Sequence, residues 1–168
     1  MRYRILASVV TGVVFGFAHA ASAQQPAAAP PPTAYGSPGI KLDQAKKAAE
    51  AAEAEAKKNG WNMAIAVVSS SGWLVHFSKL DDTQFASIEI AQHKARAAAT
   101  FRRPTKSFED RVAAGGGGLA VLTLDGVIAS AGGVPIVSGG KVIGAMGCSG
   151  GTSAQDEQVC KAGADAIK

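Results

Sequence analysis

Apolar residues recur with the period of a helix in two segments of the chain. In residues 42–58 they return at steps of three and four, while lysines and glutamates fill the other faces. Asn59 and Gly60 follow, and both tolerate the left-handed backbone that commonly ends a helix. Residues 85–101 repeat the pattern with a row of alanines, and Pro104 then ends it. The pattern predicts helices at 42–58 and 85–101, the second with a face of small side chains.

Shorter apolar runs predict strands. Residues 63–69 are rich in β-branched side chains, and a turn at 70–72 separates them from a second run at 73–79, so the two are expected to form a hairpin. The second half of the chain is expected to contain further helical turns at 107–113, a flexible joint at 115–118, strands at 119–124, at 127–131 (alternatively 134–137) and at 141–148, and a final helix at 153–167.

This order of elements fixes the expected fold class. Hairpins dominate the connections between strands, so the sheet should be mainly antiparallel, with helices packed on it. A doubly wound parallel sheet needs strands that alternate strictly with helices, and this chain lacks that alternation. The sequence therefore predicts an α/β domain of the α+β type.

The N-terminal segment has the three parts of a secretory signal peptide. Arg2 and Arg4 precede an apolar run at 5–18, and the small residues at 19–23 end it. The run is shorter than the roughly 20 residues that span a bilayer, so stable membrane insertion is not expected. We interpret residues 1–23 as a signal peptide cleaved after Ala23, residues 24–39 as a flexible leader rich in proline and alanine, and residues 40–168 as the folded domain of a periplasmic or secreted protein.

Net charge and composition limit the classes of molecule that this protein is expected to bind. The chain has 17 lysines and arginines against 13 acidic residues, a formal net charge of +4, and loss of the signal peptide would leave +2. This near balance predicts no nucleic-acid partner. Aromatic residues make up only 6% of the chain and there are 20 glycines, so its layers must pack closely, with subunit contacts completing the burial.

Few residues carry recognisable chemistry. His76 lies in the second predicted strand and His93 on the second predicted helix; with no cysteine or carboxylate cluster beside them, they do not make a zinc site.

Cys148 and Cys160 are either a disulfide in an oxidising compartment or two buried thiols. The glycine runs lack the lysine of a phosphate loop. Ser153 to Asp156 indicates a helix cap, which disfavours a phosphate there.

Several motifs together resemble the GlcG/HbpS family, from about residue 42 to the end. The chain is also similar to the C-terminal domain of some cobalamin adenosyltransferases. The motifs are AVV at 66–68 with Gly72, KLD at 79–81, AxxKA at 91–95, FxxPT at 101–105, GGVPI at 132–136, GAMG at 144–147, SGG at 149–151 and QDE at 155–157.

The resemblance implies a profilin-like fold with a five-stranded antiparallel sheet flanked by helices. Family members form homo-oligomers, some of them octamers, and several bind haem non-covalently. Exported members are linked to haem-dependent redox sensing beside a membrane kinase, which would be a membrane sensor partner here. Others accompany catabolic functions such as glycolate use.

For this chain the resemblance implies a haem site on the second helix. Haem needs an apolar slot, an axial ligand and cations for its propionates. His93 would supply the ligand, with His76 as second choice, and the nearby cations are Lys94, Arg96, Arg102 and Arg103. The position of His93 departs from the family, in which an acidic residue often precedes the lysine.

A second hypothesis is a pocket that binds small carboxylates or aldehydes in a periplasmic oxidation pathway, as a binding protein or an accessory enzyme. Lys79, Asp81 and Lys94 are its candidate residues. A purely structural oligomer is a third. No catalytic residues are assigned, and non-enzymatic binding is favoured over catalysis.

Overall fold

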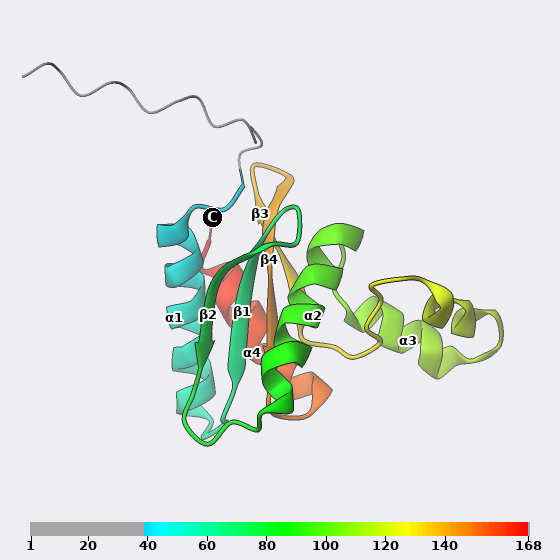
Figure 1. Ribbon diagram of the computed structural model, residues 1–168, viewed down its shortest axis with the longest axis horizontal. Helices are drawn as coiled ribbons and strands as arrows, with labels where there is room; N and C mark the ends of the chain where they lie inside the picture. Colours follow the sequence, from blue (N-terminus) through cyan, green and yellow to red (C-terminus); the bar gives the residue numbers. More distant parts are fainter. Residues whose placement is uncertain (1–38, 168) are drawn as a thin grey trace, which may run out of the picture. The chain divides into compact units, whose positions relative to one another are not determined.

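The computed structural model describes residues 39–167, so the predicted signal peptide and all of the predicted leader except Gly39 lie outside the described residues. Two pairs of consecutive strands are separated and flanked by helices along this part of the chain (Figure 1). The elements are α1 (Leu42–Lys58), β1 (Ala64–Ser69), β2 (Leu74–Lys79), α2 (Ala86–Phe101), α3 (Lys106–Ala114), the 3-10 helix η1 (Gly116–Thr123), β3 (Gly133–Ser138), β4 (Lys141–Ser149) and α4 (Ser153–Asp165).

The sheet contains four antiparallel strands in the order β2-β1-β4-β3. The central pair, β1 and β4, runs in continuous register from Ala64 opposite Ser149 to Ser69 opposite Gly144. Side chains alternate between the two faces of a strand, so Ala66 and Gly147 share one face while Ile65 and Cys148 share the other. The expectation of an antiparallel sheet with helices packed on it is confirmed.

Helices cover both faces of this sheet (Figure 1). On one face the alanines of α2 pack on Ala64, Ala66 and Val68 of β1. On the other, α1 and α4 pack on Ile65 and Val67. The α2 layer is thin because its contact residues are small: a Cβ atom added at Gly147 would overlap the carbonyl oxygen of Ala91. The glycine and alanine content therefore brings helix and sheet into close contact.

The sequence-based prediction of five strands is wrong in one segment. Residues 119–124 lie mostly in η1, which packs on α3 beyond the sheet, and residues 127–131 form no strand. The alternative at 134–137 is correct, since β3 spans Gly133–Ser138. A short apolar run does not distinguish a strand from a helical segment, and here Leu119 and Leu122 remain exposed instead of entering the sheet.

The final helix is joined to the sheet covalently. Cys148 at the end of β4 and Cys160 in α4 form a disulfide, and both residues are fully buried. The cap of α4 begins one residue earlier than predicted. The Thr152 hydroxyl accepts from the Gln155 N–H, and the Gln155 side chain accepts from the Thr152 N–H. Asp156 instead accepts from the Gly151 N–H at 3.0 Å.

No helix within residues 39–167 combines the length and the apolar character needed to cross a bilayer.

Candidate functional site

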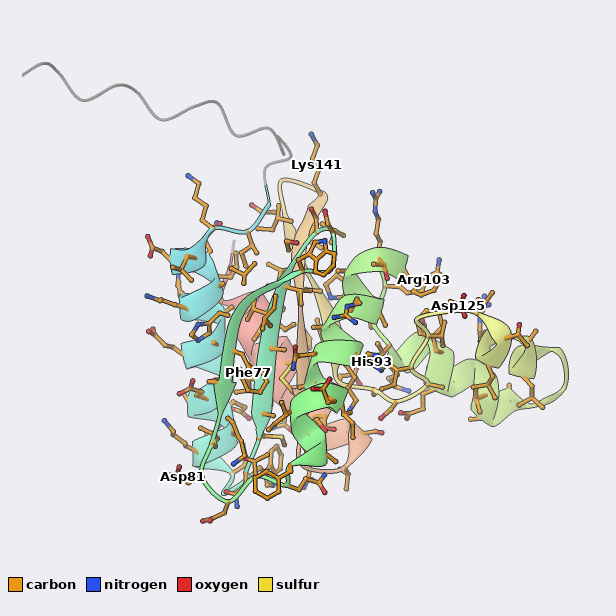
Figure 2. The ribbon with its side chains drawn as sticks, viewed as in Figure 1. Phe77, Asp81, His93, Arg103, Asp125 and Lys141 are labelled. Carbon is orange, nitrogen blue, oxygen red and sulfur yellow. A yellow bond between two sulfur atoms is a disulfide. The ribbon has the colours of Figure 1, made fainter. Side chains whose placement is uncertain are left out.

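His93 lies on the exposed face of α2. The opposite face of the helix, which includes Ala91, Ala95 and Ala98, is buried against the sheet. Residues three or four positions apart are neighbours on a helix surface, so Glu89 and Arg96 flank His93. In Figure 2 the imidazole lies on the side of α2 that is nearer to α3. The ring is therefore accessible to a ligand approaching α2 from solvent.

An apolar strip borders His93 on α2. Ile90 and Phe101 lie three positions before and eight positions after it, along one side of the helix, and Ala97 between them is fully buried. Ile90 and Phe101 are half-buried, and Phe101 meets Phe108 of α3 with ring centroids 5.2 Å apart. The strip therefore faces α3. His93 combines an exposed imidazole with an apolar flank and, at Arg96, a cation one turn away.

The second predicted histidine lies on the other side of the sheet. His76 pairs with Val67 across β1 and β2, and directly paired residues share a face. Val67 belongs to the core beneath α1 and α4, so half-buried His76 lies on the α1 side while His93 lies outside α2. The two histidines cannot bind the same metal ion within one chain.

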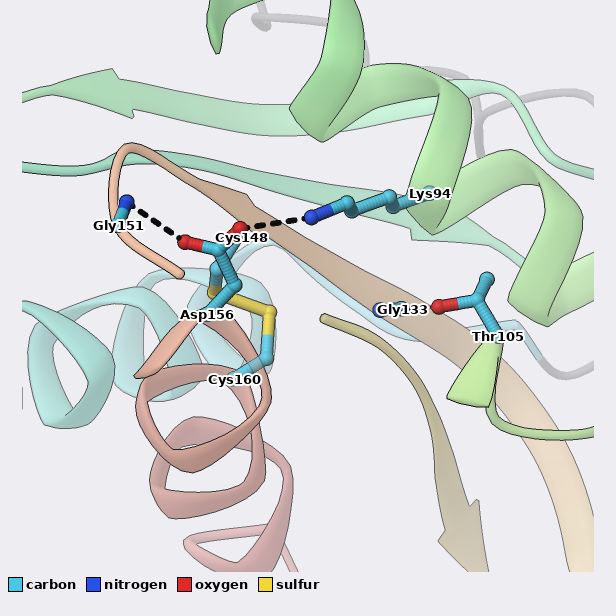
Figure 3. Close-up of a disulfide and its surroundings, with 7 residues drawn as sticks. All are labelled: Lys94, Thr105, Gly133, Cys148, Gly151, Asp156 and Cys160. Carbon is cyan, nitrogen blue, oxygen red and sulfur yellow. Dashed lines mark hydrogen bonds and ion pairs between the residues drawn. A yellow bond between two sulfur atoms is a disulfide. The ribbon is translucent and has the colours of Figure 1, made fainter. Parts of the chain in front are cut away.

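Lys94 is not the solvent-facing cation that the sequence predicted. Its Nζ atom lies 2.7 Å from Oδ2 of Asp156, and the two side chains are only 2% and 4% exposed (Figure 3). On a helix, adjacent residues point about 100° apart, so Lys94 turns inward where His93 turns outward. The ammonium therefore links α2 to α4 and is unavailable to a propionate in this structure.

Glycine makes room for this ion pair. A Cβ atom at Gly132 would lie 2.7 Å from the Asp156 Cβ and 3.1 Å from the Lys94 Nζ, so any larger residue would collide with the pair. Burial raises the pKa of Asp156, against the opposing effect of its hydrogen bond to Lys94. Sequence reasoning missed this pair because its members are 62 positions apart; the only local signals were the AxxKA and QDE motifs.

Arg102 is separated from His93 by the remaining length of α2. Nine residues at a rise of about 1.5 Å place it roughly 13 Å further along the helix axis. It ends the helix with a left-handed backbone, φ 52° and ψ 40°. Arg103 follows, and its Nε donates to the Phe101 carbonyl. Of the four predicted cations, Arg96 is therefore the one beside His93 on an exposed surface.

Lys79 and Asp81 do come together, at the far end of β2. They line a cavity of about 440 Å³ with Lys57, Trp61 and Asp82. Lys79 donates to the Leu80 carbonyl and lies 5.9 Å from the ring centroid of exposed Phe85. Lys94 is not part of this cavity, so the structure brings together two of the three residues predicted for a small-molecule pocket.

Across residues 39–167, three or more His, Cys, Asp or Glu side chains nowhere gather as they would around a bare metal ion. Haem iron has different needs, because the porphyrin supplies four nitrogens and the protein need add only an axial ligand. One exposed imidazole with an apolar flank is therefore compatible with haem.

Comparison with known proteins places these features in a family. The model of the family described as haem degrading protein HbpS-like matches residues 40–165. The GlcG protein of Escherichia coli K12 is 45% identical over 99 residues, which are 59% of this chain and 72% of GlcG. A 15.0 kDa protein of Citrobacter freundii is 34% identical over 128 residues, covering 75% of this chain and 90% of that protein.

Solved structures agree with this assignment. A double mutant of HbpS from Streptomyces reticuli superposes with a TM-score of 0.72 at 29% identity, covering 87% of this chain and 99% of that one. A PduOC:heme complex superposes with a TM-score of 0.69 at 23% identity, covering 77% and 96%, and so shares the fold. The relationship expected from the motifs at 66–157 is confirmed: the chain belongs to the HbpS-like family.

Proposed function

We propose that this protein binds haem non-covalently on the outer face of α2, with His93 as the axial ligand. The observation that carries the proposal is the match of residues 40–165 to the HbpS-like family, whose description names haem-degrading proteins. A PduOC:heme complex with the same fold supports it.

The residues around His93 suit the chemistry of haem. The imidazole offers a nitrogen to the iron, and the half-buried side chains of Ile90 and Phe101 offer apolar surface to the porphyrin ring. Arg96 offers a cation to a propionate. Bound haem would supply an iron centre with redox chemistry; the protein's part is to hold the ring, ligate the iron and limit the access of water.

Export and assembly belong to the same proposal. We place the protein in the periplasm or outside the cell, because residues 1–23 have the pattern of a signal peptide and because Cys148 and Cys160 are joined. We also propose a homo-oligomer, up to an octamer, and a role in haem-dependent redox sensing with a membrane sensor as partner. The exposed apolar side chains of Phe85 and Leu122, 84% and 58% exposed, support association.

Hemin titration tests the binding site. The wild-type protein should give a shifted Soret band that saturates at a fixed ratio of hemin to protein, and His93→Ala should weaken binding at least tenfold. His76→Ala is the matched control, because it removes an imidazole from the opposite side of the sheet. Absence of a spectral change at stoichiometric hemin, or equal losses in the two variants, would overturn the proposal.

The cavity beside Lys79 favours a second candidate function, binding of a small carboxylate or aldehyde. Two ammonium groups, Lys57 and Lys79, line it together with Asp81 and Asp82. A thermal-shift screen with glycolate, lactate and glyoxylate tests it. Stabilisation that disappears in Lys79→Ala, in a protein that hemin leaves unchanged, would favour this function over haem binding. Absence of stabilisation by every compound would exclude it for this ligand class.

A further inference from the structure

Three elements meet at the end of the sheet opposite the Lys79 cavity. The β1–β2 turn lies on the last turns of α2, since a Cβ atom at Gly72 would touch the side chains of Arg96 and Thr100. The β3–β4 turn is nearby, because Ser69 at the end of β1 pairs with Gly144 of β4. Between them is a cavity of about 540 Å³, lined by Ser70, Ser71, Arg102, Gly140, Lys141 and Val142.

The charge of this cavity is of one sign. Its lining contains a guanidinium and an ammonium and no carboxylate. All ion pairs within residues 39–167 involve other side chains, so neither Arg102 nor Lys141 is neutralised by one there. Figure 2 shows Lys141 extending outward from the β3–β4 turn. Lys141 also lines a neighbouring cavity of about 310 Å³ that contains Lys41 and likewise no carboxylate.

The backbone at Arg102 is that of a position where glycine is favoured. Helices often end with one left-handed residue, usually glycine, because a Cβ atom strains that conformation. Here the residue is arginine at φ 52°, although a glycine would adopt this backbone with less strain. A cation at a helix C-terminus is favourable in itself. Arg103 supplies such a cation already, because it donates to the Phe101 carbonyl. The favourable charge at the helix end therefore does not require an arginine at position 102.

We propose that this end of the sheet is a binding site for a small oxyanion, a phosphate or carboxylate group held between Arg102 and Lys141. The guanidinium provides paired N–H donors that match two oxygens of such a group, and the ammonium adds a second charge. The hydroxyls of Ser70 and Ser71 add neutral donors. Val142 gives the cavity one apolar wall, which suits an anion carried on a small organic molecule.

This site is independent of the proposed haem site. Arg102 is roughly 13 Å along α2 from His93 by helix rise, and the cavity lining includes none of His93, Arg96 or the apolar strip. Anion binding should therefore persist in His93→Ala, and hemin binding should persist when Arg102 is replaced.

Calorimetric titration of the whole protein with pyrophosphate and with citrate, at matched ionic strength, tests the proposal. Arg102→Gly should weaken binding at least tenfold while the unfolding temperature stays at or above the wild-type value, because glycine relieves the left-handed backbone. Lys141→Ala, at the exposed first residue of β4, should weaken binding without affecting the fold. Lys46→Ala removes an exposed charge from α1 and is the control; it should change the affinity less than twofold.

The relative affinities of the two probes identify the anion. Tighter binding of pyrophosphate assigns a phosphate ligand, and tighter binding of citrate assigns a carboxylate. The proposal is overturned if neither probe binds at millimolar concentration, if Arg102→Gly and Lys141→Ala both bind as the wild type does, or if Lys46→Ala loses as much affinity as they do.

Discussion

Two adjacent residues of α2 lie in opposite environments, and this difference decides which of them is accessible to a ligand. His93 faces solvent, whereas Lys94 passes inward to a carboxylate on α4. Burying a charge costs free energy of folding unless the charge is paired. Lys94 therefore stabilises the interior through its ion pair, and ligand binding depends on the exposed residues around it.

Removal of Lys94 should destabilise the fold strongly. Lys94→Met leaves the Asp156 carboxylate buried without its partner, and breaking a buried pair in this way typically costs about 3–5 kcal/mol. Denaturant unfolding at neutral pH measures the loss. Lys106→Met is the matched control, because its ion pair with Asp110 is exposed and should contribute less than about 1 kcal/mol. Similar losses in the two variants would contradict this role of Lys94.

The pH dependence of stability shows whether burial or the ion pair dominates at Asp156. Burial raises its pKa above the ordinary 3.8, so the folded state binds a proton more readily than the unfolded state does. The favourable contribution is then complete below pH 3.8 and is lost as the pH rises through the raised pKa. The free energy of unfolding of the wild type, relative to Asp156→Asn, should therefore fall over this range. A relative stability that rises with pH would mean that the ion pair outweighs burial.

At the scale of elements, contact between α2 and the sheet depends on the absence of side chains. Gly147 of β4 lies under Ala91, with no room for a Cβ atom between them. The helix can pack this close to the sheet only because the contact residues on both are glycines and alanines.

Gly147→Ala should therefore separate α2 from β4. Overpacking of a well-packed core costs about 1–3 kcal/mol, and we expect a loss in this range by denaturant unfolding. Gly117→Ala is the control, since a Cβ atom there has no neighbour within 4 Å. A Gly147→Ala variant as stable as Gly117→Ala would show that the close packing of α2 on β4 does not depend on Gly147.

The sequence predicted the elements with a clear period and failed where the pattern was local and short. Helix α1 spans Leu42–Lys58 as expected, and α2 differs from its prediction by one residue, because an amphipathic repeat and a terminating signal mark each. Residues 119–124 are mostly apolar but form no strand, and all of them except Leu124 belong to η1. The ion pair of Lys94 with Asp156 could not be predicted, because contacts between distant residues depend on the tertiary fold.

At the scale of the whole molecule, much apolar surface remains uncovered in the single chain. Trp73 is exposed just before β2, and Phe85 is exposed just before α2. Leu119, Leu122 and Leu124 are exposed on or next to η1. Monomeric proteins rarely expose extended apolar patches, so association would bury surface that one copy leaves in water.

Sedimentation velocity should show a homo-oligomer at micromolar concentration. Leu122→Lys places a charge on the exposed leucine surface next to α3 and should shift the distribution toward smaller species. Lys106→Gln, a polar change on the adjacent α3, is the control and should leave the mass unchanged. A wild-type protein that sediments as a monomer throughout would contradict the proposed assembly.

Ligand rescue tests the central claim, haem ligation by His93, most directly. His93→Gly should lose the wild-type Soret spectrum with hemin, and added imidazole should restore it by supplying the missing nitrogen to the iron. His76→Gly should keep the spectrum without imidazole. A His93→Gly variant that binds hemin with wild-type affinity and an unchanged spectrum would contradict the account.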